Sequence, residues 1–416
     1  MMRALAVKFF LLLAALSLAA CGGGGGSSSV AGGSNNNSSG GETLTIPAAA
    51  NVQTVSVESG PGGFVNTLFT SVTVCVPGTT NCQTVDHVMV DTGSSGLRLM
   101  ASALQSSLIL PPHYDGRGHL VAECAQFADG VTWGPLKQSD VQVSGERAYN
   151  IAIQVIGDPA YPGIPNECAN AGPSENTVTA FGANGVLGVG LFKRDCGPSC
   201  LSAGNGFYYL CPCQDSSTSS AVDTAYQVPN PVALFANDNN GVFIELPDAP
   251  AQGTTSLTGA LVFGIGTQTN NTLGTEKIFK VAPDTGNFVT TYNGRAYNTS
   301  LIDSGSSINF FSDRTLSVCP NNDPYAPGFY CPDTTQDLSA QVQGTDSTSA
   351  TLNFSIANAS KLFHDNPNYW AFNNLGAPDV LPNSFIWGLP TFMGRKVFTA
   401  IEGQNTSAGS GPYFAF

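Results

Sequence analysis

The sequence predicts an all-β protein made of two related halves. Short apolar runs that alternate in period two, such as SVTVCV and ALVFGI, recur between clusters of Gly, Pro, Asn and Asp, as is typical of strands joined by turns. The chain of 416 residues is long enough to favour two domains. Two similar acidic turns, VMVDTGSSG around Asp91 and SLIDSGSSI around Asp303, indicate that one design occurs twice. Helices should be few and short, because no helical-period segment exceeds about a dozen residues.

The N-terminal segment is predicted to be a targeting signal and a tether. A short basic region precedes the apolar run FFLLLAALSLAA, which is too short and wrongly flanked to span a membrane. The run ends in LAAC, which resembles a bacterial lipobox, so we expect a signal peptide over 1–20 and lipidation of Cys21. The alternative is an ordinary signal peptide that is cut nearby. Residues 21–45 are then a lipidated cysteine and a flexible Gly/Ser/Asn tether, which indicates a lipid-anchored protein of the bacterial cell envelope, facing the periplasm or the cell surface.

The charge and the histidines limit the possible partners. The net charge is −14, and only 15 Lys and Arg residues are spread along the chain. Without a basic cluster to neutralise phosphates, we expect no nucleic-acid partner. The four histidines have no metal-ligand spacing, so we expect no metal and no cofactor, and we expect a monomer.

Each acid is preceded by a predicted hairpin. The sequence FTSVTVCVPGTTNCQTVDHVMV before Asp91 has two apolar strands around a Pro-Gly turn. The sequence NFVTTYNGRAYNTSLI before Asp303 has the same form, with Asn293-Gly294 as a two-residue turn. In both halves the second strand leads directly into the acidic turn.

Each acid is followed later by an apolar strand that contains a glycine. Gly188 lies in GVLGVGLF and Gly388 lies in SFIWGLPTF. A glycine inside a strand is costly unless another backbone needs the space, and we expect the acidic loop of the same half to occupy it. The common order of hairpin, acidic turn and glycine strand indicates an internal duplication. We therefore expect a first half over 46–245 and a second half over 246–416.

With these motifs, residues 46–416 resemble a two-lobed, pepsin-like aspartic peptidase in a bacterial lipoprotein form. DTGSS and DSGSS match the two active-site loops of that family, and GVLGVGL and IWGLPTFMGRKVFTAIE are similar to the strands that close its lobes. The resemblance implies two related β-barrel lobes with a cleft between them. It also implies a membrane-anchored aspartic endopeptidase that hydrolyses peptide bonds of extended polypeptides.

The sequence FADGVTWGPLKQSDVQVSG (127–145) resembles the flap hairpin that covers the cleft in this family. It has Phe127 where the family usually has a tyrosine, and Arg98 stands where an aromatic partner of that tyrosine is common. The two changes could compensate each other through an Arg over an aromatic ring, or they could mark a joint loss of flap function. Trp133 could replace the missing aromatic bulk or simply be packed. The expected flap and substrate-binding residues are Phe127, Asp129, Gly130, Trp133 and Arg98.

Two acids suit amide hydrolysis, because one must accept a proton from water while the other protonates the leaving group. A close carboxyl pair shares one proton and supplies both roles, so we expect Asp91 and Asp303 to be catalytic. A single Asp-Thr-Gly or Asp-Ser-Gly would indicate only a turn. The hydroxyls at 92 and 304 should bond across to the opposite loop, and those at 94 and 306 should donate to their own Asp. The expected supporting residues are Thr92, Gly93, Ser94, Ser304, Gly305 and Ser306.

Cys21 aside, ten cysteines remain in an exported chain, which predicts disulfides. Local spacing favours Cys75 with Cys82 and Cys319 with Cys331. The sequence CGPSC…CPC holds four cysteines that are expected to pair among themselves, which leaves Cys124 for Cys168. The competing interpretation of that sequence is a four-thiolate zinc site. The four cysteines of the CGPSC…CPC segment are Cys196, Cys200, Cys211 and Cys213.

Two functions remain open from the sequence. The first is the aspartic endopeptidase, favoured by the intact acidic loops at Asp91 and Asp303. The second is a catalytically silent peptide- or protein-binding lipoprotein that keeps the same scaffold. Phe127 and Arg98 keep the second function open, because they replace residues that the family usually has at the flap.

Overall fold

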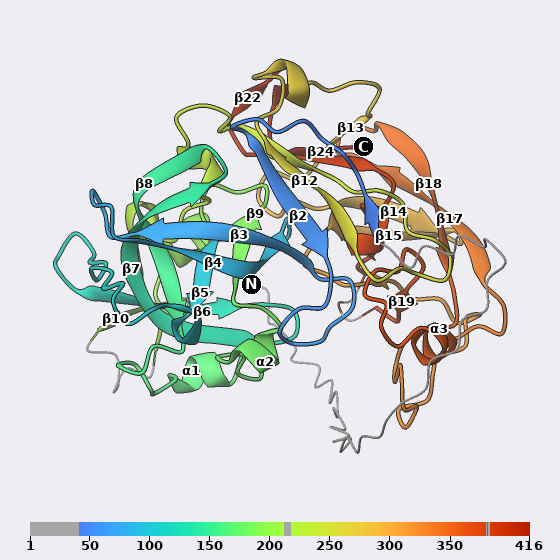
Figure 1. Ribbon diagram of the computed structural model, residues 1–416, viewed down its shortest axis with the longest axis horizontal. Coiled ribbons are helices and arrows are strands. Elements are labelled where there is room, and N and C mark those ends of the chain that lie inside the picture. The colour runs from blue at the N-terminus through green and yellow to red at the C-terminus, as the bar shows by residue number, and fades with distance from the viewer. Residues whose placement is uncertain (1–40, 212–217, 380, 382) are drawn as a thin grey trace, which may run out of the picture.

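The computed structural model of the protein describes residues 41–211, 218–379, 381 and 383–416 (Figure 1). It has 40% strand and 10% helix, with barrel-like sheets, so the all-β prediction is confirmed. The predicted signal peptide, the lipidation of Cys21 and most of the tether lie outside the described residues. Over the described ranges the α-helices are α1 (Asn166–Ala169), α2 (Val178–Phe181) and α3 (Ala359–Asp365).

The strands are short and follow one another closely along the chain. Up to residue 245 they are β1 (Glu42–Thr43), β2 (Val52–Val57), β3 (Leu68–Cys75), β4 (Cys82–Asp91), β5 (Ser95–Met100), β6 (Leu120–Gln126), β7 (Val131–Val143), β8 (Glu146–Ile156), β9 (Gly185–Val189), β10 (Tyr208–Cys211) and β11 (Gly241–Glu245). Beyond it they are β12 (Leu257–Phe263), β13 (Ile278–Lys280), β14 (Phe288–Tyr292), β15 (Arg295–Ile302), β16 (Asn309–Phe310), β17 (Gln336–Gln343), β18 (Ser349–Ile356), β19 (Gly376–Ala377), β20 (Ile386–Trp387), β21 (Lys396–Ala400), β22 (Asn405–Thr406), β23 (Gly409–Ser410) and β24 (Tyr413–Ala415). The 3-10 helices are η1 (Ala101–Ala103), η2 (Gly197–Leu201), η3 (Thr224–Tyr226), η4 (Val232–Leu234), η5 (Thr269–Asn271) and η6 (Leu389–Thr391).

The two halves are joined through a large shared sheet. Within the described residues it has 15 strands. Fourteen of them run in the order β10-β6-β7-β8-β5-β9-β4-β3-β2-β12-β11-β21-β24-β13, and β1 pairs with β12 beside this path. A second sheet has seven strands in the order β18-β17-β14-β15-β20-β16-β19. In Figure 1, β3 to β10 lie at the left, β14 to β18 lie at the right, and β2 and β12 lie between them. The expected boundary at 245/246 falls at the end of β11, which pairs with β12 and β21.

Both hairpins that lead to an acid are present. Strands β3 and β4 are antiparallel, and Cys75 lies opposite Cys82 at the turn. Strands β14 and β15 are antiparallel around a two-residue turn at Asn293 and Gly294. The turn residues have φ of 49° and 74°, which is the left-handed region that Asn-Gly favours in such a turn.

The interiors of the two halves differ in composition. In the first half, buried aliphatic side chains such as Val90, Leu97 and Leu187 fill the space between the strands. In the second half, Phe311 stacks on Phe385 with ring centroids 4.9 Å apart, and Phe385 stacks on Trp387 at 4.3 Å. Stacked and edge-to-face rings add specific packing geometry to the burial of apolar surface.

Four disulfides lie within the described residues, and three of the predicted pairs are confirmed. These are Cys75–Cys82, Cys124–Cys168 and Cys319–Cys331. The fourth joins Cys196 to Cys200, which agrees with pairing inside the CGPSC…CPC group. Because that bond consumes two of the four thiolates, the zinc interpretation is wrong. Cys213 lies outside the described residues.

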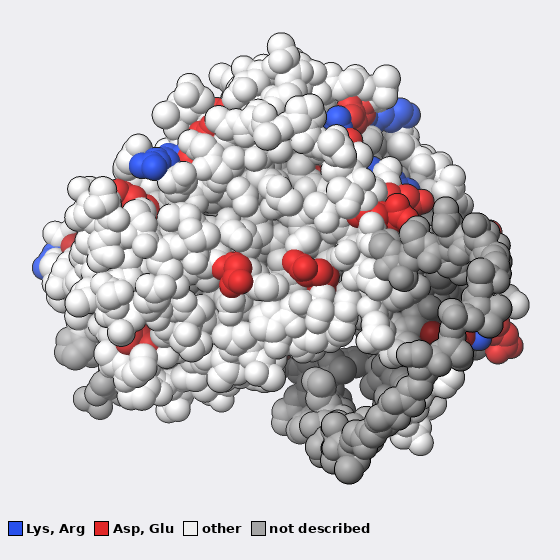
Figure 2. Space-filling view, viewed as in Figure 1, with Lys and Arg blue, Asp and Glu red and all other residues white. Residues whose placement is uncertain are grey.

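The surface view shows few charged side chains on the visible face, and the Lys and Arg residues there are scattered rather than gathered into a patch (Figure 2). Over the described part of the chain, none of the helices has the length and apolar character needed to cross a membrane. Nor do these residues contain a group of three or more His, Cys, Asp or Glu side chains that could hold a metal ion.

Candidate active site

Asp91 and Asp303 occupy equivalent places in the two halves. Asp91 is the last residue of β4 and lies beside Gly188 of the parallel strand β9. Asp303 directly follows β15, and its N–H donates to the Trp387 carbonyl at 2.9 Å on the parallel strand β20. Apolar strands therefore carry each acid to the point where it leaves the hydrophobic layer.

Each loop bonds to its own acid in the same way. The Gly93 N–H donates to Oδ1 of Asp91 at 2.7 Å, and the Ser94 hydroxyl donates to Oδ2. In the second half the Gly305 N–H donates to Oδ1 of Asp303 at 2.8 Å, and the Ser306 hydroxyl donates to Oδ2 at 2.7 Å. These donors hold each carboxyl group in one orientation, and both expected serine bonds are present.

The two loops are also bonded to each other. The Thr92 N–H donates to the Ser304 hydroxyl at 3.0 Å, and the Ser304 N–H donates to the Thr92 hydroxyl at 3.0 Å. The hydroxyls then donate onward into the opposite strand, from Ser304 to the Val90 carbonyl at 2.8 Å and from Thr92 to the Ile302 carbonyl at 3.3 Å. The expected cross-loop hydrogen bonds are therefore present, and they fix the relative position of the acids.

Glycine at 93 and 305 allows the acids to face each other. A Cβ atom on Gly93 would lie 2.7 Å from Oδ1 of Asp303, and a Cβ on Gly305 would lie 2.7 Å from Oδ1 of Asp91. Both distances are shorter than a carbon and an oxygen tolerate without bonding, so each acid lies against the backbone of the opposite loop. A side chain at either position would push the acids apart.

The strand glycines also make room for the acidic loops, as expected. A Cβ on Gly188 would lie 2.8 Å from the Ser94 hydroxyl oxygen. A Cβ on Gly388 would lie 2.7 Å from the Ser306 carbonyl oxygen and closer still to that of Ile308. Each loop therefore rests directly on the glycine strand of its own half.

The two acids interact electrostatically. The pKa of Asp303 is raised well above its usual range, first by desolvation, although part of the side chain is exposed, and then by the charge of Asp91. A side-chain hydrogen bond with Asp91 raises the pKa of Asp303 further. Since a hydrogen bond between two carboxyl groups needs a proton on one of them, this arrangement suits a pair that holds one proton.

The β6–β7 hairpin carries the residues expected at the flap. The stretch 127–145 covers only its tip and second strand, because the first strand is β6. At the tip the Phe127 N–H donates to the Gly130 carbonyl at 2.8 Å. The protein atoms that surround the Asp129 carboxyl group raise its pKa by desolvation, and the charge of Asp91 raises it further. Phe127 packs edge-to-face on Phe181, with centroids 5.6 Å apart.

Two of the expected flap residues point elsewhere. Trp133 is 1% exposed, packs edge-to-face on Tyr209 and donates to the Tyr161 carbonyl at 3.2 Å, so it is a packed residue. Arg98 is 3% exposed and pairs with carboxylates instead of covering an aromatic ring. The suggested compensation, in which Arg98 covers the ring of Phe127, is therefore wrong, because the guanidinium group is occupied by two buried carboxyl groups.

The comparison with known protein families matches residues 47–416 to the model of a family described as a protein of unknown function, DUF3443. The chain belongs to the DUF3443 family. No curated protein matches it.

The sequence reasoning missed a buried polar group in this DUF3443 chain. Glu123 is fully buried in β6, and burial raises its pKa well above the usual range even though the charge of Arg98 opposes the shift. Asp195 and Tyr208 complete the group. A single acid inside the apolar run LVAECA was the signal that could have revealed it, since an unpaired charge is not tolerated in a buried strand.

Proposed function

We propose that the protein is a membrane-anchored aspartic endopeptidase with a two-lobed, pepsin-like fold, in which each half supplies one acid. The observation that supports this function is the pair of mirrored loops, in which Thr92 and Ser304 bond across and the acids meet at Gly93 and Gly305. Turn chemistry alone would explain one such loop. It does not explain two loops that bond to each other and hold their acids together.

In the proposed reaction the acids share one proton. The ionised acid accepts a proton from a water molecule, whose oxygen attacks the carbonyl carbon, while the protonated acid donates its proton to the carbonyl oxygen. When the C–N bond breaks, the acid that took up the water proton donates it to the leaving nitrogen, and the other acid takes a proton back from a hydroxyl of the intermediate, so that the pair again holds one proton. The aspartic-protease pair is the standard example of this coupling. Because the pKa of Asp303 is raised, the form with one proton persists from acidic pH upward until this proton is lost.

The substrate is proposed to be an extended polypeptide that lies between the acids and the β6–β7 hairpin. The charge of Asp91 contributes to the raised pKa of Asp129 at the hairpin tip, as expected if the tip lies near the acids. An extended peptide would bind there through its own main-chain hydrogen-bonding groups. The lipid on Cys21 would hold the enzyme at the membrane, facing the periplasm or the cell surface.

The test uses the full chain in detergent, incubated with an unfolded protein from about pH 3 to about pH 8. Cleavage is expected on the acidic side, and Asp91→Asn and Asp303→Asn should each reduce it by at least ~100-fold. Both variants keep the size and most hydrogen bonds of the acid, so folding should persist. Cleavage that survives both substitutions, or a rate that does not change with pH, would contradict the proposal.

A silent binding protein is the second candidate, and Phe127 favours it. Its ring packs on Phe181 and carries no hydroxyl, so this side chain cannot hydrogen-bond near the acids. If the wild-type chain binds an unfolded protein without cutting it, and Asp91→Asn binds equally well, this second function is the correct one.

A further inference from the structure

The first half contains a buried polar group that connects the Asp91 loop to the β6–β7 hairpin. Arg98 of β5 donates from Nη1 to the Ser95 carbonyl at 3.0 Å, within the acidic loop itself. From Nη2 it donates to Glu123 Oε1 at 2.6 Å and to Asp195 Oδ2 at 3.1 Å. The three ionisable side chains are at most 5% exposed, so their interactions are little weakened by solvent.

The group reaches both strands of the hairpin. Glu123 belongs to β6, and its carbonyl accepts from Gln154 Nε2 at 2.8 Å. The Gln154 Oε1 in turn accepts from the Thr132 hydroxyl on β7 at 2.8 Å. Gln154 lies opposite Arg98 where β8 pairs with β5. The acidic loop, the central strands and the hairpin are therefore joined by buried hydrogen bonds that run through the side chains of Arg98 and Gln154 and the backbone carbonyls of Ser95 and Glu123.

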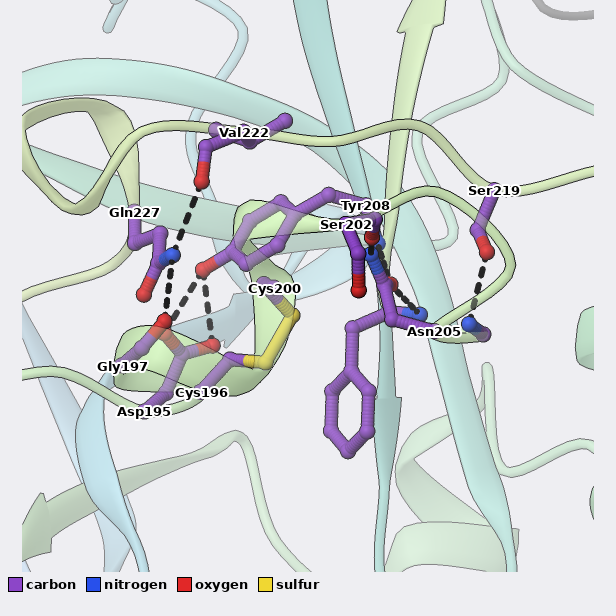
Figure 3. The surroundings of a disulfide bond; sticks show 12 residues. Asp195, Cys196, Gly197, Cys200, Ser202, Asn205, Tyr208, Ser219, Val222 and Gln227 are labelled. Atoms are coloured by element: carbon purple, nitrogen blue, oxygen red, sulfur yellow. Dashed lines mark hydrogen bonds between the residues drawn. A yellow bond between two sulfur atoms is a disulfide. The ribbon is translucent and has the colours of Figure 1, made fainter. Parts of the chain in front are cut away.

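Asp195 is held from the other side. Figure 3 shows the Tyr208 hydroxyl directed at its carboxylate, with distances of 2.7 and 2.8 Å to the two oxygens. The same hydroxyl accepts from the Val228 N–H at 2.8 Å. Asp195 directly precedes Cys196, which is bonded to Cys200. Asp195, which pairs with Arg98, is thus held by Tyr208 on one side and by the short Cys196–Cys200 disulfide loop on the other.

We propose that Arg98 is a positioning residue that fixes the Asp91 loop relative to the β6–β7 hairpin through Glu123 and Asp195. The path to the acid is short, because Ser95, whose carbonyl Arg98 holds, follows Ser94, whose hydroxyl donates to Asp91. A shift of the backbone at Ser95 would rotate Ser94, weaken its hydrogen bond to Asp91 and change the position of Asp91 relative to Asp303. The effect on hydrolysis rests on the proposed function, whereas the link between loop and hairpin does not.

The experiment measures amide hydrogen exchange and peptide hydrolysis on the full chain in detergent. Arg98→Lys keeps the charge but cannot hold Ser95, Glu123 and Asp195 together in one fork. Tyr208→Phe keeps every charge and removes only the hydroxyl that holds Asp195. It therefore tests the proposed link between loop and hairpin even if Arg98→Lys does not fold. The matched control is Lys137→Gln, which removes a partly exposed ion pair to Asp158 from β7.

We expect exchange in 91–96 and in 120–132 to rise together, by at least about tenfold in Arg98→Lys and by about threefold in Tyr208→Phe. Hydrolysis should fall by similar factors in kcat, with KM changed less than about threefold. The control should leave both segments unchanged. Exchange that rises in the hairpin alone, or in neither segment of a folded variant, would overturn the inference. If the wild-type chain does not hydrolyse peptides and both segments still respond, the positioning link stands and the peptidase proposal fails.

Discussion

The strands beneath the Asp91 loop carry aliphatic side chains, whereas those beneath the Asp303 loop pack against stacked aromatic rings. The contrast is clearest at the residues that directly precede each acid and each supporting glycine. Val90 lies beside Leu187 in the first half, and Ile302 lies beside Trp387 in the second. The glycine that supports each acidic loop comes immediately after these residues, at 188 and 388.

The buried polar anchors differ as well. In the second half the neutral side chain of Asn309 accepts from the Gly388 N–H at 3.0 Å and from the Thr391 hydroxyl at 3.1 Å. In the first half the anchor is the charged Arg98 with Glu123 and Asp195. Nevertheless, the hydrogen bonds around Asp91 and Asp303 correspond one to one. The acidic loops are therefore defined by their own backbone and by each other, and the interiors below them are free to differ.

The equivalence of the two loops is tested most severely by adding a methyl group to one of them. Gly93→Ala or Gly305→Ala would place a Cβ 2.7 Å from the opposite acid and separate the carboxyl groups. Each should lower hydrolysis by at least ~100-fold and stability by about 1–3 kcal/mol, which peptide cleavage and urea unfolding would measure. A large loss in one variant and none in the other would show that the loops are not equivalent.

The contrast between the interiors can be measured at the matched positions. Leu187 and Trp387 are both 1% exposed. Trp387→Ala should cost about 4–5 kcal/mol, because it removes stacking on Phe385 and a hydrogen bond to Thr290. Leu187→Ala should cost about 3 kcal/mol. Urea unfolding monitored by circular dichroism tests this order, and the reverse order would contradict it.

The cross-loop bonds should be nearly symmetric. Thr92→Val and Ser304→Ala each remove a hydroxyl that both donates and accepts. Because one buried N–H of the partner loop then loses its acceptor, each should destabilise the fold by about 1–3 kcal/mol. The double variant should cost less than the sum, with a coupling of about 1 kcal/mol. Additive losses in thermal unfolding would mean that the loops do not depend on each other.

Acids with a raised pKa are more frequent in the first half, which predicts an asymmetric response to pH. Burial, followed by the charge of Asp238 and a hydrogen bond to it, raises the pKa of Glu146 to about 7. A carboxyl whose folded pKa is raised contributes full stability below its ordinary pKa and loses it as pH rises through the folded value. The wild type should therefore lose about 1 kcal/mol between about pH 5 and about pH 8 from this group.

The variant Glu146→Gln cannot ionise, so its stability should change less over that interval. Thermal unfolding across pH measures the difference. The exposed Glu42→Gln serves as a control with the same loss of one charge. If Glu146→Gln follows the wild-type profile, Glu146 is not the group that titrates.

Local chemistry explains why much of the site was predictable from sequence. Asn293-Gly294 and the two acidic turns need particular backbone angles and hydrogen-bonding side chains, which only a few residue types supply. Period-two patterns identified the strands that deliver Asp91 and Asp303, and short cysteine spacings identified Cys75–Cys82 and Cys319–Cys331. These features are determined within a few residues of each other along the chain.

The remaining features depended on contacts between segments that are distant in sequence. The run LVAECA signals that Glu123 needs a buried partner, but no local pattern identifies Arg98 and Asp195 as the partners. Nor does one show that Trp133 turns away from the hairpin surface, or that β2 and β12 join the halves in one sheet. A buried charge takes whichever partner the fold brings within reach, since leaving it unpaired costs more than any local preference provides. The two acidic loops therefore follow from residues that are neighbours in the chain, whereas the residues that hold these loops in place come together only when distant segments pack.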